Sequence, residues 1–147
     1  MIIAGRGVPR GARTDALCEF VDVMPTLLET TGVAAPPGLE GVSLSPLFAD
    51  ADRPWKAAAF SQYPRDGDRT GGLSLMGDAV RTDRYRYVCW TDRDTGKIVA
   101  EELYDHARRV LPARNLAEDP EQVVGLADAR RLLNAGWKRV QDGVRVP

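Results

Sequence analysis

The chain has 147 residues, of which 44% are hydrophobic and 28% charged, with 20 Lys and Arg residues against 21 Asp and Glu residues. These values describe about one globular domain, and no apolar run approaches the roughly 20 residues of a membrane-spanning helix. A formal net charge of -1 excludes a nucleic-acid-binding protein that depends on a basic face, so we expect neither nucleic acid nor a membrane as partner.

The first residues are typical of the end of a strand. Met1–Ala4 is mostly apolar and leads directly into a turn that contains Gly and Pro over residues 5–11. Because a domain rarely opens in this way, we expect the chain to begin within a fold whose earlier strands precede it. No basic region followed by an apolar run indicates a secretory signal, so the cellular location is left open.

A helix is expected at about residues 23–31. Asp22 is placed to cap its free N–H groups, and Gly32 follows its last turn. Residues 34–56 contain Pro and Gly at six positions, which predicts a long connecting loop with one turn at 44–48.

Three segments with a clear β-strand pattern follow a buried strand expected at Ala57–Gln62. Leu75–Thr82 and Tyr85–Thr91 show β-type alternation on either side of a short turn, and Ile98–Tyr104 follows a second, polar turn. The pattern predicts an antiparallel meander of three or four strands.

The chain ends in a predicted amphipathic helix that begins at Asp119, with Pro at its first position. Its apolar stripe steps by three and four residues. The stripe consists of Leu126, Ala129, Leu133, Trp137 and Val140. We therefore expect an α+β fold, in which a small antiparallel sheet over 57–104 is covered by a helix over 119–140 and preceded by an arm of strand, helix and loop.

Direct signs of catalysis are weak. A serine or cysteine hydrolase needs a histidine base, and the only histidine is His106, which we interpret as a polar residue at a strand end. Cys18 and Cys89 show no zinc-ligand spacing and are expected to be buried free thiols.

Two pairs of carboxylates have the spacing of calcium-loop ligands, Asp66 with Asp68 and Asp92 with Asp94. Neither pair is followed by the Gly and the distal Glu of an EF-hand. We interpret all four as solvated turn residues.

The aromatic and basic residues of the central strand resemble a platform for single-stranded nucleic acid, but their alternation favours packing on both faces of a sheet. Tyr85, Tyr87 and Cys89 share one face, and Arg86, Val88 and Trp90 share the other.

Taken together, four segments resemble the C-terminal subdomain of sulfatases of the iduronate-2-sulfatase type. In chain order they are Phe60–Arg65 with the sequence Phe-Ser-Gln-Tyr-Pro-Arg, Met76–Thr82, Tyr85–Trp90 and Glu102–Asp105. Upstream, Val21–Leu28 resembles the segment that leads into this subdomain across the wider sulfatase and alkaline-phosphatase-like superfamily. The Ser-Gln-Tyr-Pro-Arg segment is the most specific. The resemblance covers nearly the whole chain, with residues 1–56 corresponding to the end of the α/β sulfatase domain and a connecting loop, and 57–147 to the C-terminal subdomain.

The resemblance implies hydrolysis of sulfate esters by a formylglycine, formed from the Cys of a Cys-x-Pro-x-Arg motif beside a calcium ion. That motif and the metal ligands are absent here, because Cys89 to Arg93 reads Cys-Trp-Thr-Asp-Arg, with Thr91 in place of Pro. We therefore expect no catalytic residue and no metal ligand in this chain, and no activity of the chain alone. Three origins fit this sequence: a misassigned start, a broken gene, or a split enzyme with a separate N-terminal chain.

By the same resemblance, Gln62, Tyr63, Arg65 and Arg81 are expected to shape a pocket for a sulfated carbohydrate. An Arg fork suits sulfate and carboxylate groups on a sugar. The alternative for these residues is that they brace two subdomains, and the alternative for the chain is a non-catalytic module that binds anionic sugars or docks on a sulfatase. Two departures from the family pattern, Asp78 and the pair Arg109-Val110, leave the substrate open.

Overall fold

The computed structural model describes residues 1–5, 7–67, 71–107 and 114–141. The chain divides into two compact units, one formed by Met1–Lys56 with Gln141 and the other by Ala57–Val140. Within the described ranges, no helix has both the length and the apolar character needed to cross a membrane.

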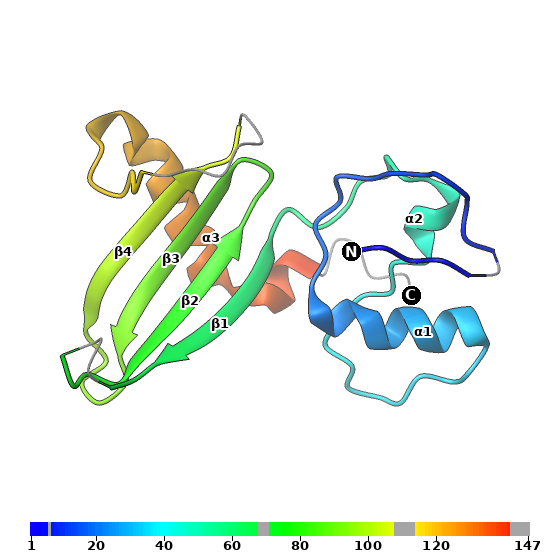
Figure 1. Cartoon of the computed structure of the whole chain (residues 1–147), viewed down its shortest axis with the longest axis horizontal. Helices are drawn as coiled ribbons and strands as arrows, with labels where there is room; N and C mark the ends of the chain where they lie inside the picture. The colour runs from blue at the N-terminus through cyan, green and yellow to red at the C-terminus, as the bar shows by residue number, and fades with distance from the viewer. Residues whose placement is uncertain (6, 68–70, 108–113, 142–147) are drawn as a thin grey trace. The chain divides into compact units, whose positions relative to one another are not determined.

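The first unit contains a 3-10 turn, η1 (Phe20–Asp22), and two helices, α1 (Val23–Thr31) and α2 (Pro46–Ala49) (Figure 1). The helix expected at 23–31 is confirmed. It ends because Gly32 adopts φ 72, a left-handed conformation that glycine reaches without steric cost, and the Gly32 N–H bonds back to the carbonyl of Glu29.

Two expectations for this unit are wrong. Met1–Ala4 lies outside every strand, because no described strand lies beside it to pair with its backbone. Asp22 makes no side-chain cap for α1. Instead its fully buried carboxylate accepts hydrogen bonds from the backbone N–H groups of Glu19 and Val42, both at 2.8 Å, and from Lys56 Nζ at 2.5 Å.

The second unit is built on a four-stranded antiparallel sheet in the order β1-β2-β3-β4, which confirms the predicted meander. The strands are β1 (Ala59–Arg65), β2 (Leu75–Arg81), β3 (Tyr85–Asp92) and β4 (Ile98–Asp105). β1 lies slightly later than the sequence predicted and includes Pro64. As an edge strand, it tolerates a residue that cannot donate a ladder hydrogen bond.

A 3-10 turn, η3 (Pro120–Gln122), leads into α3 (Val123–Gln141), which passes behind the sheet in Figure 1. Asp119 begins this segment as predicted, since its carboxylate accepts a hydrogen bond from the Glu121 N–H at 3.0 Å. The fold class predicted from sequence, α+β with a sheet covered by the C-terminal helix, is confirmed.

The core of the unit lies between α3 and the facing side of the sheet. Its buried members are Ala58, Val80, Tyr87, Cys89, Leu103, Leu126 and Ala129. Leu133 and Val140 of the predicted stripe pack against this cluster, whereas Trp137 follows Gly136, whose φ of 78 interrupts the helix. No described element of the second unit covers the other side of the sheet, which we call the open face.

Candidate functional site

Strand alternation divides the four residues predicted to bind substrate. Side chains alternate between the two faces along a strand, and residues paired in the register share a face. By this rule Tyr63, Arg65 and Arg81 lie on the open face, opposite the face that carries the buried core residues. Gln62 lies on the side that faces α3. The four residues predicted from the sequence to form one pocket are therefore divided between the two faces of the sheet.

Gln62 is instead engaged with Asp78, its partner in the β1–β2 register. Its Nε2 donates a hydrogen bond of 2.6 Å to the Asp78 carboxylate. This contact gives a structural reason for an acidic side chain at position 78, one of the two departures from the family pattern. The other departure, Arg109-Val110, lies outside the described residues.

Tyr63 and Arg65 meet at an open cavity of about 670 Å³ at one end of the open face. Eight residues line it. They are Tyr63, Pro64, Arg65, Asp66, Leu75, Trp90, Ala100 and Glu102. Tyr63 is 66% exposed, so its ring is available to a ligand.

Trp90 organises the floor of this cavity. Its indole lies over Gly77, where an added Cβ would come within 2.6 Å of a ring carbon, so only glycine permits this approach. The guanidinium of Arg65 lies 4.3 Å from the indole centroid, and the indole Nε1 donates a 2.8 Å hydrogen bond to Glu102. Stacking orients the Arg65 guanidinium, and its N–H groups donate to no other described residue, so they can meet an oxyanion.

The network continues along the open face. The second carboxylate oxygen of Glu102 accepts a 2.9 Å hydrogen bond from the Tyr104 hydroxyl, and the Arg86 guanidinium lies 4.8 Å from the Tyr104 ring centroid. Burial, followed by the hydrogen bond to Glu102, raises the pKa of Tyr104 above its ordinary value, so the phenol stays protonated at neutral pH.

Arg81 does not line the cavity. It is partly buried, and its Nη1 donates to the carbonyl oxygens of Thr82 and Tyr85 at the β2–β3 turn. Desolvation, opposed by Asp83 and reinforced by Arg86, lowers the pKa of Arg81 from its ordinary value. Arg81 stands directly opposite Arg86 in the register of β2 and β3.

Sequence reasoning missed Trp90, Glu102 and Tyr104 as parts of the site. Alternation did place Trp90 on the face opposite Tyr87, and this is confirmed. Nothing in the local pattern indicated that Gly77 would leave room for a flat indole, because the two residues are brought together only by strand register.

His106 follows the end of β4. Its backbone N–H donates to the Arg84 carbonyl at 2.7 Å, and its side-chain Nε2 is buried and has no hydrogen-bond partner among the described residues. Burial and then the charges of Arg81 and Arg86 lower the pKa of His106 below its ordinary value, so the ring is neutral at pH 7.

The expectation that both cysteines are buried holds for Cys89 only. Cys89 belongs to the core on the α3 side, whereas Cys18 is exposed. Both thiols are free.

Asp92 and Asp66 accept hydrogen bonds from residues of their own loops. Asp92 accepts hydrogen bonds from the Asp94 N–H at 3.1 Å and the Thr95 hydroxyl at 2.6 Å, and the bond from Thr95 is the main cause of its lowered pKa. Asp92 is nevertheless buried, so it is not the solvated residue that we expected. Asp66 accepts a 2.8 Å hydrogen bond from Ser74, and Asp68 lies outside the described residues.

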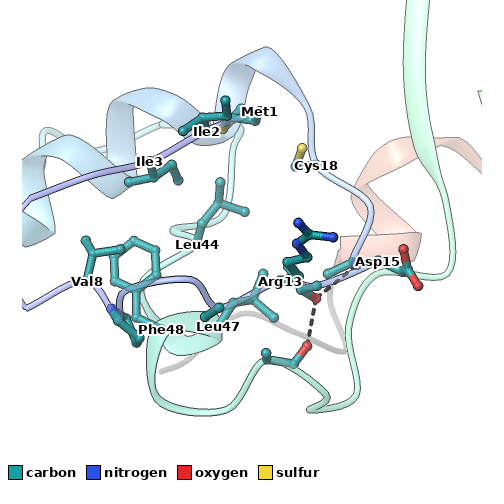
Figure 2. A pocket seen from close by; sticks show the side chains of 15 residues that line it. Met1, Ile2, Ile3, Val8, Arg13, Asp15, Cys18, Leu44, Leu47 and Phe48 are labelled. Carbon is teal, nitrogen blue, oxygen red and sulfur yellow. Dashed lines mark hydrogen bonds between the residues drawn. The ribbon is translucent and has the colours of Figure 1, made fainter.

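The first unit has its own cavity, of about 510 Å³ (Figure 2). Figure 2 shows mainly apolar side chains around it, including those of Ile3, Leu44, Leu47 and Phe48. Arg13 and Asp15 are the charged residues in its lining. This composition suits apolar packing better than the recognition of a charged sugar.

Comparisons with known proteins agree with the resemblance found in the sequence. The family described as N-sulphoglucosamine sulphohydrolase, C-terminal, matches residues 1–134. Arylsulfatase K of Mus musculus is 26% identical over 129 residues, which cover 86% of this chain and 21% of that protein. A Delta 4,5-hexuronate-2-O-sulfatase of Bacteroides thetaiotaomicron is 29% identical over 126 residues, which cover 85% of this chain and 24% of that protein.

A solved structure of a 2-O GAG sulfatase superposes with a TM-score of 0.63 and 30% sequence identity. The match covers 82% of this chain and 25% of that structure. The chain thus spans about a fifth to a quarter of the length of the relatives that it matches.

Proposed function

The chain belongs to the N-sulphoglucosamine sulphohydrolase C-terminal family, and from this premise we propose that it forms the C-terminal part of a sulfatase of the iduronate-2-sulfatase type. In this role the open face of the sheet supplies one wall of the pocket for a sulfated sugar. The nucleophile comes from an N-terminal sulfatase domain or chain. The 29% identity to a hexuronate-2-O-sulfatase supports a sulfated uronic acid as the substrate class.

The observation that carries this proposal is the cavity at Tyr63, Arg65 and Trp90. A sulfated sugar needs an aromatic surface for its ring, a cation for its sulfate or carboxylate, and acceptors for its hydroxyl groups. The exposed Tyr63 ring, the stacked Arg65 and the Glu102 carboxylate offer these three functions within one lining.

The family implies calcium and a formylglycine in its full-length members. The described residues do not fit either group. No three His, Cys, Asp or Glu side chains within the described ranges come together as metal ligands would, and Cys89 is buried in the core within β3. We therefore assign no chemical step to this chain, whose proposed contribution is to bind and orient the substrate.

The test is to measure, by calorimetry, the affinity of the purified chain for a 2-O-sulfated uronate disaccharide. Arg65→Ala should weaken binding about tenfold or more, the typical effect of losing a hydrogen bond to a charged group. Arg131→Ala is the matched control, because Arg131 is exposed on α3 and its ion pair among the described residues is with Asp128 of the same helix. Equal affinities for the two variants would refute the proposed pocket wall.

A sulfatase assay then tests whether this chain binds the substrate while an N-terminal chain supplies the nucleophile. We propose that the chain alone is inactive and that hydrolysis of a sulfated disaccharide requires an N-terminal sulfatase chain with calcium. Activity of the isolated chain would contradict this assignment and direct attention to Cys89 and His106.

A specific feature favours docking as the second candidate function. Large apolar side chains of the first unit are exposed, and they include Ile2 at 97% and Phe20 at 94%. Exposed apolar surface of this kind marks association sites. A module that docks through this unit would bind an N-terminal sulfatase chain without binding the disaccharide.

A further inference from the structure

A second cationic cluster lies on the open face, beyond the cavity, and the proposed function does not use it. Arg81 and Arg86 are direct partners in the β2–β3 register and lie on the same face. Like charges in this arrangement repel each other and destabilise a sheet unless something compensates them.

No carboxylate of the described residues compensates the two guanidinium groups by an ion pair. Asp105, at the end of the neighbouring strand, is held by Arg84 at 2.7 Å. Glu102 is engaged by Trp90 and Tyr104. Asp83 acts on Arg81 only as a nearby charge in the exposed turn.

Both guanidinium groups are nevertheless positioned. Arg81 is held by the carbonyl oxygens of Thr82 and Tyr85, and Arg86 is exposed above the ring of Tyr104. Positioned cations without a counter-ion are what an oxyanion site requires, because little side-chain entropy is lost when the anion binds.

His106 adds an independent observation. Strand alternation continued from Tyr104 places its side chain on the open face, and its ring experiences the charges of Arg81 and Arg86, opposed by the charge of Asp105. Its Nε2 is buried without a partner among the described residues, and a buried polar atom of this kind calls for an unseen partner. An Nε2–H tautomer can donate to an anion that the two guanidinium groups attract.

We propose that Arg81, Arg86 and His106 form a second oxyanion subsite, which receives a sulfate or carboxylate group of the same saccharide that the Arg65 cavity binds. This assignment rests on the proposed function for the identity of the ligand. It implies that the chain recognises a saccharide with at least two anionic groups.

His106 makes the test unambiguous, because it is the only histidine of the chain and its imidazole NMR signals need no assignment. The purified full chain is titrated with sodium sulfate, with the 2-O-sulfated uronate disaccharide and with sodium chloride at matched ionic strength. We expect a saturable shift of the His106 signals with sulfate and with the disaccharide, beyond the shift in chloride. A bound anion also favours the imidazolium, so the pKa of His106 rises on saturation.

Arg86→Ala should weaken both titrations about tenfold or more, and Arg86→Lys should restore part of the affinity. Arg131→Ala should leave both unchanged. Arg86 is the chosen position because its side chain is exposed, whereas Arg81 also holds the turn. A normal backbone NMR spectrum of each variant shows that the fold is kept.

The two proposals fail in different ways. Arg65→Ala should reduce disaccharide binding but leave the sulfate response of His106 intact, so a defect in the cavity does not imitate a defect in the subsite. A response no larger than in chloride, or one unchanged by Arg86→Ala, would overturn the subsite. Saturation by sulfate but not by the disaccharide would overturn its assignment to a saccharide.

Discussion

The indole of Trp90 lies against the backbone of Gly77, its partner in the β2–β3 register. Trp90 is only 7% exposed although it lies on the open face, and the Arg65 guanidinium lies 4.3 Å from the centroid of its ring. A glycine in the middle of a strand thus determines the floor of the candidate pocket. Glycine weakens a strand interior, and here that loss is offset by the close approach of an aromatic ring.

Gly77→Ala should therefore displace the indole, because its Cβ would come within 2.6 Å of a ring carbon. We expect a loss of about 1–3 kcal/mol in the free energy of unfolding and a weaker affinity for the sulfated disaccharide. Urea unfolding monitored by tryptophan fluorescence measures the change in the free energy of unfolding. Gly5→Ala is the control, since no atom lies within 4 Å of its Cβ position, and a loss of similar size there would contradict the explanation.

Lys56→Met should destabilise the first unit. Lys56 Nζ lies 2.7 Å from Glu19 and 2.5 Å from Asp22, and both its own side chain and that of Asp22 are fully buried. Removing the cation leaves a buried carboxylate uncompensated, at a cost of about 3–5 kcal/mol. Chemical denaturation of the variant measures this cost, with Lys97→Met at an exposed lysine as control. Equal stability of the two variants would exclude a role for the buried pair.

Glu101 should make stability depend on acidity. The hydrogen bond from Arg130 is the main cause that holds the pKa of Glu101 below its ordinary value of 4.5, and Tyr87 also donates to this carboxylate. Because the folded-state pKa is lowered, this stabilisation is present above about pH 4.5 and is lost as the pH falls through the folded-state value. Denaturation of wild type and Glu101→Gln across this range should show a shallower pH dependence in the variant. Parallel curves would assign the acid sensitivity to other carboxylates.

His106 should titrate below its ordinary pKa of 6.5, because burial and the charges of Arg81 and Arg86 disfavour the imidazolium more than the charge of Asp105 favours it. Its protonation therefore favours unfolding, and the free energy of unfolding should rise as the pH increases from the folded-state pKa to about 6.5. Arg86→Ala should raise the pKa of His106 in the absence of any anion. An NMR pH titration of the single imidazole measures both values, and an unchanged pKa in the variant would show that Arg86 does not act on this ring.

Thiol labelling should distinguish the two cysteines. Cys18 is exposed and should react rapidly with a thiol reagent, whereas Cys89 is buried in the core and should react only as the second unit opens. Cys18→Ser should remove the fast phase and leave the slow phase. A single phase with both thiols reacting together would contradict the burial of Cys89.

The sequence was sufficient for the elements whose signals are local. Alternation of apolar residues predicted β2, β3 and β4, a left-handed glycine ended α1, and a Pro after Asp119 began the last helix. The family resemblance rested on the same local segments, since the spacing of short motifs is preserved when strands and turns are preserved. Local rules failed at Asp22. Its residue type and position are those of a helix N-cap, but its carboxylate accepts a hydrogen bond from a buried lysine 34 residues later.

Only the tertiary structure determined which side chains meet. Gln62 and Tyr63 are neighbours in the sequence, yet the two-residue period of a strand sends one toward α3 and the other to the open face. Trp90, Gly77 and Arg65 form one contact because strand register aligns three segments, and register depends on the whole sheet rather than on any one of them. Composition and pattern therefore determined the fold class and the family, whereas the candidate site required long-range pairing, which no local sequence signal specifies.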